Sequence, residues 1–198
     1  MNRFNFREPT RGLSFLSTPL LTTALLLWST ASMAGSSSTP LNFTATFIAG
    51  TCDITVSPSD INWGSIPSAE IKQAGASGVQ PRDLAVNYAN CTGFGIHPKL
   101  TISGTTLSAG IPLFTKNNNA GNDDASGYGV RLVSSAAPQT ALGDGDRVSV
   151  GTPGVPLSEL NGTQTPFQAS LSCGNNCAAS TLHGGMLSAT VTFQFLYE

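Results

Sequence analysis

Four cysteines, Cys52, Cys91, Cys173 and Cys177, have the most specific chemistry in this 198-residue chain. An even number of cysteines in an exported chain is typical of disulfides, and four cysteines allow three pairings. We favour Cys52–Cys91 and Cys173–Cys177. The second pair closes the turn "CGNNC", and the first closes a long loop whose cross-link is worth roughly 3–4.5 kcal/mol by chain entropy. The alternative is a zinc site of four thiolates, which the absence of C-x2-C spacing and an oxidising compartment both disfavour.

The other residues that could do chemistry are few. His97 in "GIHPK" and His183 in "TLHGG" have the setting of loop residues, and two histidines are too few for a copper or zinc centre. Asp123–Asp124, Asp144 and Asp146 would suit calcium, but "NDD" and "GDGD" are ordinary turn sequences and lack the terminal Glu of a calcium loop. There is no G-x-S-x-G motif and no glycine-rich phosphate loop. We therefore expect neither an enzyme nor a bound cofactor.

The first 34 residues have the pattern of a secretory signal. An arginine-containing lead precedes the apolar run at 13–28, and "STASMAG" places small residues at Ser32 and Ala34, where a signal peptidase would read them. A membrane anchor is the alternative, but the run is interrupted and shorter than the roughly 20 apolar residues that an anchor needs. Removing 1–34 takes away three of nine Lys and Arg and one of eleven Asp and Glu, which leaves a net charge of −4. No basic stripe remains, so nucleic acid is not an expected partner.

Alternation of apolar and polar residues recurs along the mature chain. It predicts strands at 41–49, 53–56, 61–66, 82–91, 99–103, 128–133, 147–150, 166–173 and 187–197. Clusters of Gly, Pro, Asn and Asp separate these strands. No window of about a dozen residues has a helical stripe. The sequence therefore predicts an all-β antiparallel sandwich or barrel without helices.

The two ends of the mature chain are both alternating strands. The last strand has one apolar face, made of Leu187, Ala189, Val191, Phe193, Phe195 and Tyr197. It runs to the last residue, and an open strand edge invites pairing with another chain. The first strand, 41–49, follows a flexible lead at 35–40 and comes just before Cys52.

These features resemble the pilin subunits of the chaperone–usher pathway, of the type 1 fimbria-like kind. That family has a glycine fourteen places from the end and an aromatic residue at the penultimate position, which match Gly185 and Tyr197. It also bridges its first two cysteines, which match Cys52 and Cys91. A Phe-rich alternating segment precedes the first cysteine, here in "LNFTATFIAGTC".

The resemblance implies an incomplete immunoglobulin-like sandwich that lacks its final strand and is completed by donor-strand exchange. Residues 35–51 would be the N-terminal donor-strand extension, and 52–198 the pilin domain. The donor face would consist of Leu41, Phe43, Ala45, Phe47 and Ala49. The family usually has glycine seven residues before the first cysteine, where this chain has Ala45. The alternative is that 39–49 form an ordinary first strand of a self-contained sandwich.

In such a subunit the C-terminal strand borders the groove that receives the chaperone strand and then the donor. The groove residues would be Gly185, Leu187, Ala189, Val191, Phe193, Phe195, Tyr197 and Glu198. The family also implies that basic side chains of the chaperone hold the terminal carboxylate of Glu198.

The resemblance predicts a structural subunit of a surface fimbria that passes through the periplasm, polymerises and supports adhesion. Its partners would be a periplasmic chaperone, an outer-membrane usher and neighbouring pilins, with a host receptor as a further candidate partner. The main alternative is a minor tip subunit or adhesin that binds a carbohydrate or protein through the loop at 116–129. A secreted sandwich enzyme and the chaperone itself fit the sequence less well.

Overall fold

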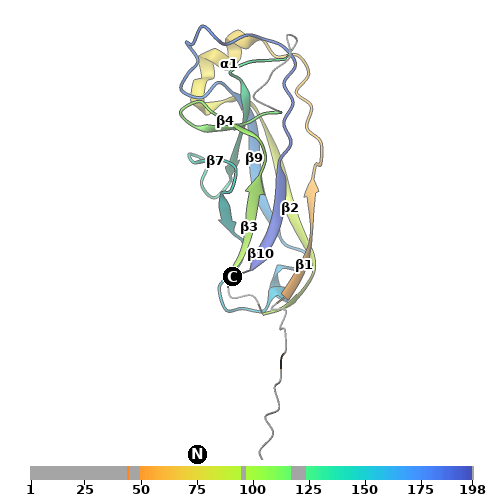
Figure 1. Ribbon diagram of the computed structural model, residues 1–198. Helices are drawn as coiled ribbons and strands as arrows, with labels where there is room; N and C mark the ends of the chain where they lie inside the picture. The colour runs from red at the N-terminus through yellow and green to blue at the C-terminus, as the bar shows by residue number, and fades with distance from the viewer. Residues whose placement is uncertain (1–43, 45–49, 95–96, 117–123, 198) are drawn as a thin grey trace, which may run out of the picture. The chain divides into compact units, whose positions relative to one another are not determined.

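The computed structural model describes residue 44 and residues 50–94, 97–116 and 124–197 (Figure 1). The predicted signal, the five residues of the predicted donor face and Glu198 lie outside the described residues.

Two antiparallel sheets make up the domain. The larger sheet has the strand order β1 (Gly50–Ser57), β2 (Val79–Gly93), β9 (Gln164–Ser172), β6 (Gly129–Ser134), β5 (Pro112–Phe114) and β4 (Thr106–Ser108), and β7 (Ala141–Leu142) pairs with β6. The smaller sheet has the order β10 (Thr192–Tyr197), β3 (Pro98–Ser103) and β8 (Arg147–Ser149). This architecture confirms the predicted all-β class.

Alternating side chains build the core. Leu84, Val86 and Tyr88 of β2 are buried, and so are Leu100 and Ile102 of β3 in the smaller sheet. Successive strand residues point to opposite faces, so each sheet presents one apolar face. The largest side chains with almost no exposed surface are Phe114, Phe167, Leu100, Ile102, Leu113 and Leu157. One continuous apolar cluster therefore joins the two sheets.

Both cysteine pairs favoured from the sequence are joined in the structure. Cys52–Cys91 cross-links β1 to β2, and Cys173–Cys177 closes the turn that follows β9. The amide of Asn161 holds the backbone beside the first bridge: its Oδ1 accepts from the Cys91 N–H at 2.6 Å, and its Nδ2 donates to the Cys91 carbonyl at 3.1 Å. The first bridge therefore fastens the edge strand β1 to the larger sheet.

The prediction of a chain without helices is wrong, because α1 (Ser68–Ala74) and two 3-10 turns, η1 (Gly75–Ser77) and η2 (Leu157–Leu160), are present. The helix α1 has only seven residues, begins after Pro67 and ends at Ala74, where Gly75 follows with a φ of +60°. Two turns of helix are too short to give a visible apolar stripe. Among the described residues, no helix has the length and apolar character needed to cross a membrane.

The strand predicted at 61–66 is also wrong, since these residues form no ladder. Gly64 has φ +67°, and its N–H donates to the Asn62 side-chain oxygen at 2.7 Å. This side-chain turn diverts the backbone from an extended course.

In the last predicted strand, only Thr192–Tyr197 is regular β structure, and the residues from Leu187 to Val191 precede it without strand assignment.

The acidic turns have local roles. Asp144 Oδ1 accepts from the Gly104 N–H at 3.0 Å, and Asp146 Oδ2 accepts from the Gly143 N–H at 2.7 Å. Both carboxylates thus satisfy backbone donors, as the turn interpretation of "GDGD" predicts.

Thr101 in β3 provides a test of packing. Its Oγ1 is buried and has no hydrogen-bond partner among the described residues. A buried hydroxyl without a partner keeps its desolvation cost of about 1–3 kcal/mol. We expect Thr101→Val to raise the free energy of unfolding by about 1 kcal/mol in urea titration, because valine keeps the shape and removes the hydroxyl. Thr101→Ser, which keeps the hydroxyl and loses the methyl, is the control and should not stabilise. A lower stability for the valine variant would contradict the assignment.

Candidate functional site

Each sheet has an end strand on the same side of the domain, and we define the groove as the strip between these two strands, β1 and β10. β1 ends the larger sheet and pairs with β2, and β10 ends the smaller sheet and pairs with β3. The two end strands approach each other but form no ladder with one another in the described part of the chain (Figure 1). Each therefore has one edge without a ladder partner among the described strands. Such edges can pair with an added strand.

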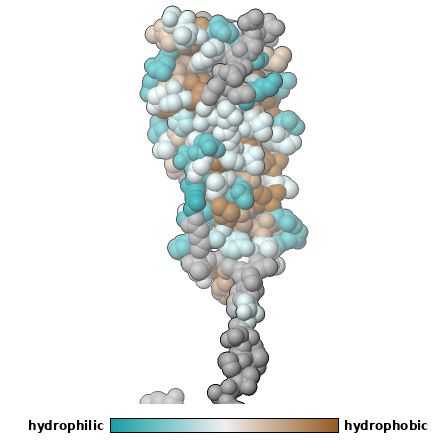
Figure 2. Space-filling view, in the orientation of Figure 1, coloured by the Kyte–Doolittle hydropathy of each residue, from teal (hydrophilic) through white to brown (hydrophobic). Residues whose placement is uncertain are grey.

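The side chains beside this groove are apolar and only half buried. On the C-terminal side, half-buried and exposed residues alternate as predicted: Leu187, Ala189, Val191, Phe193 and Phe195 are half buried, and Ser188, Thr190, Thr192 and Gln194 are exposed. On the β1 side, Ile54 and Val56 are half buried and pack on the same core. Figure 2 shows apolar surface on the face that carries β1 and β10. These side chains keep a share of apolar surface that an inserted strand would remove from water.

Aromatic contacts form the floor of the groove. The Phe193 ring of β10 lies 5.1 Å from that of Phe167 in β9, and the Phe195 ring lies 6.1 Å from that of Tyr88 in an edge-to-face arrangement. Phe167 has no exposed surface. These two pairs join the smaller sheet to the larger one beneath the groove.

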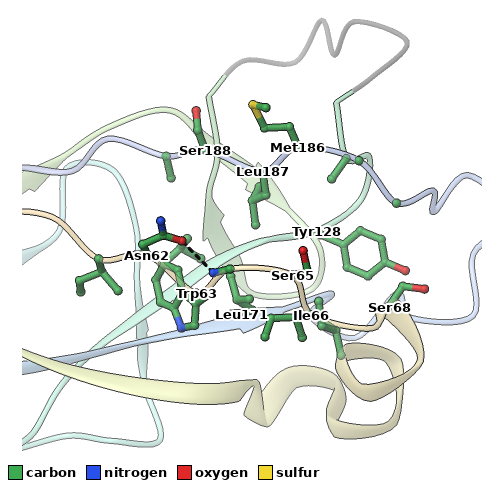
Figure 3. A pocket seen from close by; sticks show the side chains of 18 of the residues that line it. Asn62, Trp63, Ser65, Ile66, Ser68, Tyr128, Leu171, Met186, Leu187 and Ser188 are labelled. Atoms are coloured by element: carbon green, nitrogen blue, oxygen red, sulfur yellow. Dashed lines mark hydrogen bonds between the residues drawn. The ribbon is translucent and has the colours of Figure 1, made fainter.

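The segment that leads into β10 lines a pocket of about 940 Å³. Its wall combines the irregular segment 60–66, the helix α1 and the segment 184–189, together with Tyr128, Val130 and Leu171 (Figure 3). Leu187 points towards Trp63 across the pocket. The Trp63 Nε1–H donates to the Gln80 carbonyl at 2.7 Å, which fixes the indole. The lining suits an apolar side chain better than a charged ligand.

Backbone hydrogen bonds hold the C-terminal wall of this pocket. The Ala125 N–H donates to the Met186 carbonyl at 3.0 Å, and the Ser126 N–H donates to the His183 carbonyl at 3.0 Å.

Both histidines, His97 and His183, are exposed and outside regular strands, as loop residues are. No group of three or more metal-ligating side chains occurs among the residues described.

Tyr88 gives the groove floor a dependence on pH. Burial raises the pKa of its phenol from 10.0 to about 12, although a 2.7 Å hydrogen bond with Thr165 Oγ1 opposes the rise. Because the pKa is higher in the folded state, its stabilising contribution is complete below pH 10 and is lost as the pH rises from 10 towards 12. We expect the free energy of unfolding to fall over this window, and to fall less steeply in Tyr88→Phe. Equal slopes in urea titrations of the two proteins would contradict the assignment.

The structure places all but one of the predicted groove residues along the segment that lines the pocket and continues into β10. Gly185, Leu187 and Ala189 line the pocket, Val191 packs on the core, and Phe193, Phe195 and Tyr197 lie on β10. The exception is Glu198, which lies outside the described residues. The opposite wall was missed: Trp63, Ile66, Ile71, Tyr128 and Leu171 also line the pocket. Of this wall, Tyr128 and Leu171 lie in predicted strands, and Trp63 and Ile66 lie in "INWGSI", whose apolar spacing also predicts a strand.

Comparison with known proteins identifies the family. Residues 41–198 match the family described as fimbrial protein. This chain belongs to the fimbrial protein family. The pilin resemblance inferred from the sequence is thereby confirmed, and so is the predicted location in a fimbrium at the cell surface. The fimbrial protein family is a family of structural proteins, in agreement with the expectation that the chain is not an enzyme.

Solved structures of pilus subunits have a similar fold. The fimbrial chain is 16% identical to a chain from the structure of a chaperone–usher pilus that concerns rod uncoiling, with a TM-score of 0.50, over 85% of this chain and 100% of that one. The P pilus rod subunit PapA is also 16% identical, with a TM-score of 0.48, over 80% of this chain and 100% of PapA. No curated protein sequence matched. The likeness to the chaperone–usher pilus chain supports the incomplete immunoglobulin-like sandwich that the pilin resemblance implies.

Proposed function

We propose that this fimbrial protein is a structural subunit of a chaperone–usher fimbria and polymerises by donor-strand exchange. Residues 41–49 of one copy enter the groove between β1 and β10 of its neighbour. The observation that supports this most directly is the line of half-buried apolar side chains along 187–195, beside two strand edges without a partner in the described sheets. Before assembly, a periplasmic chaperone supplies the missing strand, and the outer-membrane usher is where the exchange takes place. The resulting fimbria supports adhesion of the cell.

The donor face is suited to this groove in two ways. Its backbone supplies hydrogen-bonding groups to the open strand edges, as in other cases of β-strand addition. Its large side chains Leu41, Phe43 and Phe47 would bury apolar surface worth roughly 1.5–3 kcal/mol each. Three such side chains give a joint that dissociates very slowly once formed. The terminal carboxylate of Glu198 is the proposed anchor for basic side chains of the chaperone.

Periplasmic expression of the full chain, with and without a co-expressed cognate chaperone, tests the proposal. We expect degradation or heat-sensitive ladders on denaturing gels without the chaperone, because the open groove either exposes the core or captures another copy. With the chaperone we expect a soluble complex of one subunit and one chaperone. A stable, soluble monomer in the absence of the chaperone would mean that the sandwich is complete, and would overturn the proposal.

A further inference from the structure

Two large apolar side chains are strongly exposed in the described part of the chain. Phe94 is 67% exposed and Met186 is 72% exposed. Phe94 directly follows β2 and forms a bridge with Pro156. Met186 stands at the mouth of the pocket, where its side chain points away from Trp63 while that of Leu187 points towards it (Figure 3). Single exposed apolar residues are common on protein surfaces, so their positions decide whether they have a role.

The two side chains mark opposite ends of the groove. β1 begins at Gly50, which is opposite Gly93, the residue before Phe94. β10 ends at the same end of the domain, where Tyr197 is opposite Pro98. The pocket and Met186 lie at the other end, beside α1, which Figure 1 places away from the start of β1 and the end of β10.

The symmetry of a filament decides which ends meet. The donor segment leaves its own subunit at Gly50, the Phe94 end. If Gly50 lay at the Tyr197 end of the neighbour's groove, like ends would face each other, and two copies could exchange segments reciprocally and close a dimer. An open filament requires a heterologous interface between unlike surfaces, and a subunit whose Gly50 end already faces one neighbour has only its other end free for the next. The donor's Gly50 must therefore lie at the neighbour's pocket end, which holds Met186.

No linker separates the donor segment from its own domain, so the Phe94 end of the donor subunit must lie close to the Met186 end of its neighbour. Nine donor residues, 41–49, span about 30 Å when extended, and the eleven residues 187–197 along the groove span about 36 Å. Gly50 follows the donor segment directly and is already in β1, where it is buried against Leu157. Two subunits joined through the groove thus bring the Phe94 end of one against the Met186 end of the other.

We propose that Phe94 of one subunit packs on Met186 and the pocket mouth of the next, which forms a second contact between subunits outside the groove. The occupant of this surface is a second copy of the same chain, and the inference depends on the proposed function. A thioether sulfur beside an aromatic ring is a favourable pair, and Met adapts its shape to the ring. This contact would limit bending at the joint between two subunits.

Cysteine cross-linking in fimbriae isolated from cells that make the full chain tests the contact. We expect the double variant Phe94→Cys with Met186→Cys to give ladders that resist heat on non-reducing gels and disappear on reduction. The single variants should give no ladder. A matched control combines Phe94→Cys with Gln139→Cys, because Gln139 is exposed on the turn between β6 and β7. Normal fimbriae without a ladder from the Phe94 and Met186 pair would overturn the contact.

Serine variants give an independent measurement. We expect Phe94→Ser and Met186→Ser each to lower the temperature at which fimbriae dissociate. The double variant should lower it no further than the stronger single variant, because both changes remove one contact. Strictly additive effects, or none, would overturn the proposal. Fimbriae that still form without residues 35–49 would instead overturn the proposed function, so the two failures are distinguishable.

Discussion

Phe193→Asp should abolish capture of the subunit by its chaperone and, with it, incorporation into fimbriae. The Phe193 ring packs at 5.1 Å on that of Phe167, which is fully buried. Loss of a fully buried aromatic side chain costs about 3–5 kcal/mol, which is an upper bound for the half-buried Phe193, and a carboxylate adds the cost of desolvating a charge. Since 1.4 kcal/mol corresponds to a tenfold change, we expect the yield of chaperone complex to fall by about a hundredfold or more.

Two variants make this result specific. Gln194→Asp places the same charge on the next residue of β10, which is exposed, and should leave capture unchanged. Phe193→Leu keeps an apolar side chain at the groove and should retain most of the complex. Co-purification with the chaperone measures all three. A Phe193→Asp subunit that co-purifies as well as Gln194→Asp would refute the place of β10 in the groove.

Strand periodicity predicts the C-terminal wall of the groove because one face of this segment packs on the protein core and the other faces water. The apolar and polar residues between Leu187 and Phe195 alternate in burial as they alternate in sequence. The start of the regular ladder was not predictable, since it depends on the partner strand. β3 ends at Ser103, opposite Thr192, and Gly104 then brings its backbone close to the Thr190 carbonyl.

The pocket could not be predicted for a related reason. Its lining joins residues from 60–66, α1, β6, β9 and 184–189, which only the tertiary fold brings together.

Other elements give no recognisable pattern in the sequence. The strands β4, β5 and β7 have two or three residues each, too few for a period of two to be recognised. The turn at Asn62 and Gly64 competes with an extended backbone, and apolar spacing alone does not reveal that competition.

Deleting residues 35–49 should separate folding from assembly. The groove of the shortened subunit is intact, so we expect the chaperone to hold it as well as it holds the full mature chain. It lacks the proposed donor segment, so it should be unable to fill the groove of a neighbour. We therefore expect incorporation into fimbriae, measured by immunoblot of heat-labile polymers, to fall below detection while the amount of chaperone complex is unchanged. Unchanged incorporation would refute the donor assignment.

Point variants within the donor segment test the same assignment without shortening the chain. Phe43→Asp places a charge on the predicted donor face, whereas Thr44→Asp places it one residue later, on the opposite face, where Thr44 is exposed. Because a strand in the groove presents alternate residues to it, only the first change should block polymerisation. If both variants polymerised equally well, the segment would not enter the groove as an alternating strand. If both failed equally, the length or charge of the extension would matter and its pattern would not. A difference in polymerisation between Phe43→Asp and Thr44→Asp would therefore show that assembly depends on the alternating pattern of this segment.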